Sequence, residues 1–282
     1  MRRVDTTTIF LRLLLLALVV MLTTAHAAAQ TQTSNDDEPD FIVPARPTVS
    51  NPAEFQRPGV LQLEYGFDGN WHEPGGDSQQ RAPLALRFAV SRRLLLELDS
   101  DLPISQTADG LRTTGAGDTQ LGVQLVLQHE AASRPGVALA YYVKLPTASA
   151  AKGLGTGRVD HNLLALFSKK LGATTFDFNA IYLLAGRTTD SGHASSGQAA
   201  LAASRNVTQR VGVQGELSGF SRNDDQAAAL FGLGVVTYQL NRRLVFDSGI
   251  RFGLTHDAPR IGAVVGLTVG VADLYKRHGK QP

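Results

Sequence analysis

The sequence contains no cysteine. A chain without thiols can form neither disulfides nor a Cys-ligated zinc or iron–sulfur centre, and it has no thiol nucleophile. Long apolar runs are also scarce, because the one candidate, residues 13–22, is about half as long as a membrane-spanning helix. Lys and Arg number 27 against 25 for Asp and Glu, so the chain lacks the basic excess that binding to phosphate backbones requires. These absences exclude a bundle of membrane helices and predict no nucleic-acid partner.

The start of the chain has the parts of an export signal. Arg2, Arg3 and Arg12 precede the apolar run, and small residues between Ala25 and Ala29 follow it. The alternative, an uncleaved anchor helix, would need a longer run. We therefore predict that residues 1–29 are a signal peptide and that the mature chain begins near residue 30, in a protein exported to the cell outer membrane.

Residues 30–58 have a different composition from the rest of the chain. They are polar, and five prolines interrupt them, from Pro39 to Pro58. This composition predicts a flexible periplasmic N-terminal arm rather than a folded domain.

Residues 59–272 alternate between apolar and polar side chains. Leu61, Leu63 and Tyr65 are separated by Gln62 and Glu64, which places the two kinds of side chain on opposite faces of a strand. About twelve such segments of roughly ten residues follow one another, near the length of a tilted membrane-spanning strand. Their connections alternate between short and long. We predict an all-β fold, a closed antiparallel transmembrane β-barrel of about 12 strands with short periplasmic turns and longer outer loops.

Some parts of this barrel are less sharply defined by the pattern. The longer loops are expected at residues 72–81, 102–117, 146–157, 187–196 and 220–226, and a polar C-terminal tail at 273–282. Between residues 159 and 238 several segments look extended, but the pattern does not fix which face of each strand is outside, so their orientation stays open. A soluble barrel or sandwich is the alternative fold, but its core would not need such long strands.

Charge decides which face of the barrel meets lipid. An Arg or Lys at the bilayer midplane of a barrel costs about 2–4 kcal/mol, so several outward charges would remove most of a folding stability of roughly 5–15 kcal/mol. The apolar face must therefore be outside. The predicted lumen-lining residues are Glu64, Arg87, Glu97, Gln124, Lys144, Asp177, Glu216, Asp247 and Arg251.

The strand number bears on the lumen itself. Eight strands are just filled by side chains and sixteen to eighteen leave an aqueous channel, so about twelve predict a narrow or partly plugged lumen. Residues 31–58 are one candidate for the plug. Candidates for aromatic residues at the membrane edges are Tyr65, Trp71, Tyr141, Tyr142, Tyr182 and Tyr238.

Motifs for catalysis are incomplete. Residues 153–157 are glycine-rich but lack the Gly-Lys-Ser/Thr ending of a phosphate loop, and Ser149 with Lys152 lacks the companion elements of serine acylases. The histidines are scattered, with no pair at metal-ligand spacing. His161 and His256, each beside an aspartate, would support a lipid-acting hydrolase if a serine lay nearby. We predict no catalytic residues, no metal and no cofactor.

Several segments resemble one outer-membrane family. Residues 58–66, 115–122, 143–147, 152–157 and 247–254 are similar, in this order, to stretches of the family named for the MetA pathway of phenol degradation. The resemblance implies a barrel that passes small aromatic or other apolar compounds across the outer membrane. The chain departs from the family in Glu38, where a basic residue is usual, and in continuing beyond Ala272 instead of ending at an aromatic. Val269 and Val271 after Gly266 still fit the final strand that barrel-assembly machinery reads.

The leading hypothesis is thus a passive outer-membrane transporter for small hydrophobic or aromatic molecules, with outer-membrane lipid and, during insertion, the barrel-assembly machinery as its partners. A barrel that conducts nothing and has a structural or surface-contact role is the first alternative. A lipid-acting barrel enzyme is the second.

Overall fold

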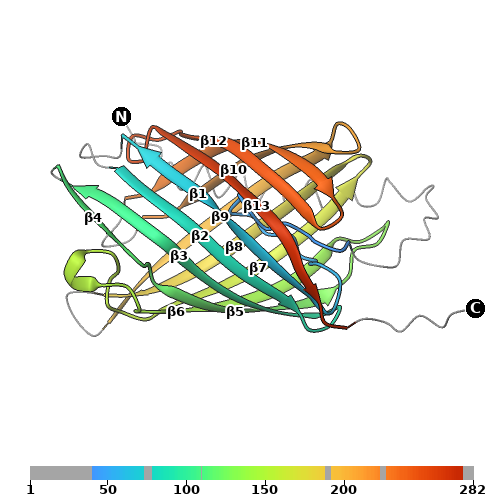
Figure 1. The fold of residues 1–282 in the computed structure, drawn as a ribbon, viewed down its shortest axis with the longest axis horizontal. Helices are drawn as coiled ribbons and strands as arrows, with labels where there is room; N and C mark the ends of the chain where they lie inside the picture. The colour runs from blue at the N-terminus through green and yellow to red at the C-terminus, as the bar shows by residue number, and fades with distance from the viewer. Residues whose placement is uncertain (1–39, 73–77, 109, 188–191, 223–226, 276–282) are drawn as a thin grey trace, which may run out of the picture.

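The computed structural model describes residues 40–72, 78–108, 110–187, 192–222 and 227–275. They form one closed antiparallel β-barrel (Figure 1). The predicted signal peptide, residues 1–29, lies outside the described residues. The strands of the described chain are β1 Val60–Trp71, β2 Ser78–Ala89, β3 Leu94–Ala108, β4 Leu111–Gly115, β5 Thr119–Gln128, β6 Gly136–Leu145, β7 Asp160–Leu171, β8 Thr174–Gly186, β9 His193–Asn206, β10 Val211–Phe220, β11 Ala229–Asn241, β12 Leu244–Gly253 and β13 Ile261–Asp273.

The ring of strands closes where the two ends of the sheet meet. Apart from β4 and β5, strands that follow one another in sequence pair with each other, and β1 pairs with β13 over its full length. Strands β4 and β5 both pair with β3 and are separated only by residues 116–118, where the Gly117 amide still donates to the Asp101 carbonyl at 2.9 Å. Counted as one interrupted strand, they give the wall 12 strands, which confirms the predicted fold.

Connection length separates the two ends of the barrel. Two to seven residues link β2 to β3, β5 to β6, β7 to β8, β9 to β10 and β11 to β12, and we call this the short-turn end. The opposite end carries the longer connections, among them residues 146–159 with the 3-10 helix Ala150–Lys152. In the part of the chain that is described, no helix has both the length and the apolar character of a membrane span.

The expected loop at residues 102–117 is wrong. Strand β3 continues to Ala108, paired with β2 as far as Thr107, and β4 returns along it from Leu111, so most of these residues form a hairpin that extends the wall. Side chains stabilise it, since the Ser105 and Thr114 hydroxyls are 2.8 Å apart and Arg112 donates to Ser105 at 2.8 Å. Such cross-strand pairs favour extended backbone even where Gly and Asp punctuate the sequence.

The apolar side chains face outward, as the cost of lipid-exposed charge required. Leu96, Leu163 and Ile250 are 46%, 52% and 49% exposed on the outer surface, whereas Gln62 and Asn179 are fully buried inside the barrel. The structure also shows which side chains face outward in the strands between residues 159 and 238. In β7, for instance, Leu163 faces out and Leu164 and Leu166 face in. The pattern was ambiguous there because both faces are apolar.

The N-terminal arm differs most from expectation. Residues 40–58, which we call the inner segment, are not a free arm but pack within the barrel, and Ala53 and Gln56 are fully buried. Figure 1 shows the segment in blue among the barrel strands. Although its composition is typical of disorder, its backbone polar groups form hydrogen bonds with side chains of the wall. These bonds offset the conformational entropy that the segment loses when it becomes ordered.

The C-terminal boundary lies later than expected. Asp273 is still part of β13, and the Leu274 amide donates to the Gly59 carbonyl at 2.7 Å. Tyr275 packs edge-on against Phe88 with 5.9 Å between ring centroids. Residues 273–275 therefore belong to the wall, and residues 276–282 lie outside the described chain.

Candidate functional site

All nine predicted lumen residues point into the barrel. Six are buried, and the side chains of Glu97, Lys144 and Arg251 are 9%, 19% and 15% exposed. They do not form a single site. One group binds the inner segment, a second forms an ion-pair network in the wall, and a third lines an open chamber.

Wall carboxylates hold the first half of the inner segment by its backbone. The Ala45 and Arg46 amides donate to the two oxygens of Glu64, both at 3.0 Å. Across the lumen, the Val49 and Ser50 amides donate to the two oxygens of Glu216 at 3.1 and 2.8 Å. Each carboxylate thus satisfies two adjacent N–H groups that have no partner in a strand or helix.

Uncharged groups hold the second half. Asn51 and Asn179 exchange two hydrogen bonds of 2.7 and 2.9 Å. The Ala53 amide donates to the Ser168 hydroxyl at 2.8 Å, and Gln124 donates to the Ala53 carbonyl at 3.0 Å. Asp177, predicted to line the lumen, does not contact the segment itself. It accepts a hydrogen bond of 2.5 Å from the Ser168 hydroxyl.

These contacts trace a circuit. Along the inner segment the partner strands are β1, β12, β10, β8, β7, β5 and β2, which is also their order around the barrel. The segment closes on itself, since the Arg57 amide donates to the Asp40 carbonyl at 2.9 Å. It therefore runs once around the inside of the wall.

Apolar contacts complete the fit of the inner segment. Ala53 packs with Leu164 and Leu166, and Phe55 packs with Leu95 and Val126. These inward apolar side chains explain why β7 showed no clean alternation, because part of the lumen wall is a core for the segment rather than a surface for water.

Arg46 occupies a slot made by two glycines. Gly66 and Gly266 are paired across β1 and β13, and a Cβ on either would collide with the Arg46 guanidinium. From this slot Arg46 donates to both oxygens of Asp247, at 2.9 and 3.2 Å. The two side chains are 10% and 4% exposed, so the ion pair is shielded from water.

Arg87 is the centre of the wall network. Its side chain is fully buried between Glu64 and Glu97, at 3.3 and 3.2 Å, and it also donates to the Val43 carbonyl of the inner segment at 2.9 Å. The Tyr142 hydroxyl donates to Glu97 at 3.2 Å. Tyr142 was a candidate for the membrane edge, but it faces the lumen, where its hydroxyl finds a charged acceptor.

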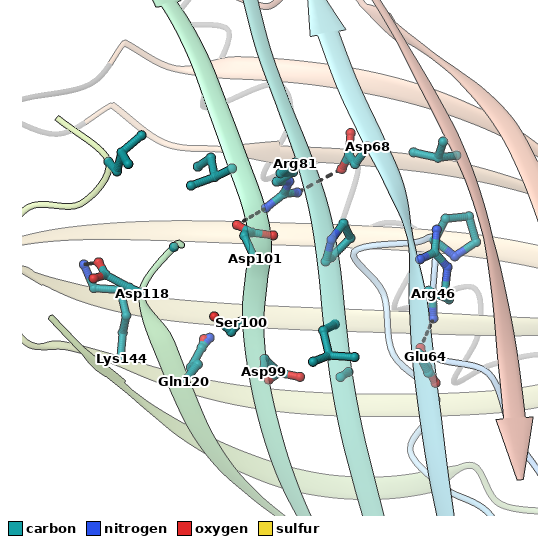
Figure 2. Close-up of a pocket in the computed structure, with 18 of the residues that line it drawn as sticks. Arg46, Glu64, Asp68, Arg81, Asp99, Ser100, Asp101, Asp118, Gln120 and Lys144 are labelled. Carbon is teal, nitrogen blue, oxygen red and sulfur yellow. Dashed lines mark hydrogen bonds and ion pairs between the residues drawn. The ribbon is translucent and has the colours of Figure 1, made fainter. Parts of the chain in front are cut away.

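A chamber of about 490 Å³ lies between the inner segment and the end with the long connections (Figure 2). Apolar side chains from the wall and from residues 146–159 form part of its lining, among them Leu84, Ile104 and Leu154. The charged side chains that line it are five acids and three bases: Glu64, Asp68, Asp99, Asp101, Asp118, Arg46, Arg81 and Lys144.

Ion pairs organise the charges of the chamber. Arg81 bridges Asp68 at 2.9 Å and Asp101 at 3.9 Å, as Figure 2 shows, and Arg251 also reaches Asp68 at 2.9 Å. On the other side, Lys144 lies 3.0 Å from Asp118 and 2.7 Å from Asp160. Acids outnumber bases, so the chamber favours cations and hydrogen-bond donors over anions.

The residues considered for catalysis are not brought together. Asp160 pairs with Lys144 rather than with its neighbour His161, which contacts Tyr141 at 2.7 Å. His256 is 3.2 Å from Asp257 and its side chain is 96% exposed. Within the described ranges, no serine hydroxyl hydrogen-bonds a histidine, and no three potential ligands cluster to hold a metal ion.

A closed barrel with an apolar outer belt and a polar lumen defines the class of outer-membrane β-barrels. Within that class, residues 45–269 match the model of the family described as "Putative MetA-pathway of phenol degradation", and the chain belongs to this family. The match begins inside the inner segment, so the family model includes part of it.

Solved structures show the same fold. The COG4313 outer-membrane channel from Pseudomonas putida F1 is 16% identical with a TM-score of 0.61, covering 85% of this chain and 99% of that one. The NanC porin is 9% identical with a TM-score of 0.52 over 74% and 98% of the two chains. The β domain of the Bordetella autotransporter BrkA is 9% identical with a TM-score of 0.50 over 75% and 99%. No curated protein matches the chain.

Proposed function

We propose that the protein is a passive outer-membrane channel for small, largely apolar molecules of the phenol type. The observation that carries this proposal is the chamber of about 490 Å³ inside a membrane-spanning wall. Its volume is within the range of about 300–1,000 Å³ that is usual for small-molecule sites. The β domain and the porin share the fold with this chain, so the fold by itself does not select the solute.

The lining of the chamber supports the solute class. Leu84, Ile104 and Leu154 provide apolar surface for an aromatic ring, while Asp99 and Asp101 provide acceptors for a hydroxyl. A phenol presents both features in one small molecule, whereas a sugar would leave the apolar surface uncovered. The description of the family, which refers to phenol degradation, points in the same direction.

The proposal includes the placement of the chain. Residues 1–29 direct export, the short-turn end lies in the periplasm, and the barrel-assembly machinery inserts the wall into outer-membrane lipid. No catalytic chemistry and no cofactor are required, because the solute moves down its gradient.

The inner segment favours a second candidate function. It follows the whole inner circumference and fills part of the lumen with its own side chains, which is also what a non-conducting structural barrel requires. Solute passage distinguishes the two functions directly.

The test is permeation into liposomes that carry the refolded mature protein. We expect phenol to enter faster than into empty liposomes and faster than a sugar or simple salts do. A variant lacking residues 40–56 shows that the assay detects an opened barrel. If the variant passes all solutes and the intact protein passes none, the structural role replaces the channel.

A further inference from the structure

The five short turns of the barrel carry an excess of positive charge. The linking residues 90–93, 129–135, 172–173, 207–210 and 242–243 contain six Lys or Arg residues and one acid, Glu130, and Lys170 lies two residues before the β7–β8 turn. That acid is paired with Lys169 at 3.2 Å. The Arg243 guanidinium lies over the Phe41 ring of the inner segment, 4.3 Å from its centroid. We call the exposed basic residues at the other four turns the basic collar: Arg93, Arg134, Lys170 and Arg210.

By sequence, the six other connections, residues 72–77, 109–110, 146–159, 187–192, 221–228 and 254–260, contain seven acids and five bases. The basic excess of the short turns is therefore not a general property of the connecting sequence, and the whole chain is nearly neutral.

The collar lies at the depth of lipid headgroups. Arg93 and Arg210 each precede by three residues a side chain that faces lipid, namely Leu96 and Val213, which are 46% and 40% exposed. At about 3.3 Å per residue, three residues place the basic group roughly 10 Å along the strand from the apolar belt. Long basic side chains at such positions extend their charge to the membrane interface.

From these observations we propose that the basic collar binds the phosphate groups of anionic phospholipids in the leaflet at the short-turn end. The collar residues lie at four of the five turns, so the collar follows most of the circumference, where headgroups surround the wall. If these cations served to bind a solute, they would need to gather only at the entrance to the lumen. Clusters of Lys and Arg beside a membrane attract anionic lipids, and salt weakens the attraction.

The test compares spin-labelled phosphatidylglycerol with spin-labelled phosphatidylcholine at the surface of the refolded barrel in phosphatidylcholine bilayers. The collar variant is R93Q/R134Q/K170Q/R210Q. The matched control, K152Q/R158Q/R222Q/R260Q, removes four exposed charges from the opposite end. Both variants must first show the heat-sensitive gel shift of a folded barrel.

For the unaltered protein we expect phosphatidylglycerol to associate about fivefold more strongly at low salt, with the preference falling toward one in 0.5 M salt (about a 4 Å screening length). The collar variant should lose the preference and the control variant should keep it. No preference in the unaltered protein, or an equal loss in both variants, overturns the proposal. The measurement requires no solute passage, so its failure is distinct from failure of the channel proposal.

Discussion

Arg46 forms a buried ion pair between the inner segment and the wall. It joins Asp247 across 201 residues of sequence, and both side chains are shielded from water. Removing one partner of a buried ion pair leaves the other charge without compensation, which costs about 3–5 kcal/mol.

We therefore predict that R46A loosens the inner segment. The unfolding free energy should fall by about 3 kcal/mol, and single-channel conductance should rise because the segment no longer holds its place in the lumen. Urea unfolding and planar-bilayer recordings measure the two effects. R222A, in the exposed connection between β10 and β11, is the control and should change neither.

The glycine slot provides a second route to the same change. In G266A the new methyl group meets the Arg46 guanidinium, so the arginine must leave Asp247. We expect G266A to raise the conductance as R46A does, and G266A/R46A to add little to R46A, because the two substitutions disrupt one contact. Fully additive effects would show that the slot and the arginine act separately. The measurement is conductance of the four proteins in a double-mutant cycle.

Lys144 determines the charge balance on its side of the chamber. K144A leaves Asp118 and Asp160 without their shared cation. We predict that the preference for cations over anions increases about twofold or more, since charged side chains lining a pore determine its ion selectivity. Reversal potentials in a KCl gradient measure it. An unchanged reversal potential for K144A would mean that permeating ions do not pass close to this side of the chamber.

The charged lumen residues were predictable from sequence, and their partners were not. Alternation along one strand is enough to place Glu64, Lys144 and Asp247 inside, because an outward charge in lipid is too costly. The contact of Arg46 with Asp247 depends on closing a ring of strands, and nothing within one strand encodes it. Glu216 indicated only that some partner exists, since a buried carboxylate needs hydrogen-bond donors.

At the scale of elements, a place in the lumen was one of the predictions for the inner segment, but its ordered structure was not predicted because its composition is that of a disordered linker. Its prolines and polar residues do not form regular structure, but its backbone amide groups meet acceptors that project from β1, β10, β8 and β7. Order here comes from the wall and not from local propensity. The hairpin of β3 and β4 was missed for the converse reason, since Gly and Asp punctuate a region that cross-strand pairs hold extended.

We predict that a chain lacking residues 40–56 still forms the barrel, because the strand pairs do not depend on the segment. Its conductance should increase severalfold, toward that of an unplugged lumen. A chain that begins at Asp40 keeps the segment and is the control, with conductance like the full mature protein. Bilayer recordings with a heat-shift gel test both. Loss of the folded band without the segment would instead make the segment a requirement for assembly.

At the scale of the whole molecule, closure depends on the last strand. Strand β13 pairs with β12 on one side and with β1 on the other. Without it two strand edges stay open, and unpaired backbone groups in lipid cost several kcal/mol each. The barrel architecture was predictable at this scale because strand length and connection length repeat along the chain, and the family was predicted from short segments that resemble it.

A chain ending at Gly253 should therefore give no heat-sensitive folded band after refolding into bilayers. A chain ending at Tyr275 retains all of β13 and the packing of Tyr275 on Phe88, and should fold as the full protein does. Gel mobility with and without heating decides between these outcomes. A folded band from the shorter chain would show that β12 can pair with β1 instead.

The circuit of the inner segment also affects the mechanics of the wall. A hollow cylinder of strands deforms most easily by flattening, which moves opposite sides together without breaking any strand pair. Because the segment is tied to β1, β12, β10, β8, β7 and β5, flattening would stretch some ties and compress others. The segment thus acts as an internal brace that keeps the cross-section round against the lateral pressure of the surrounding lipid.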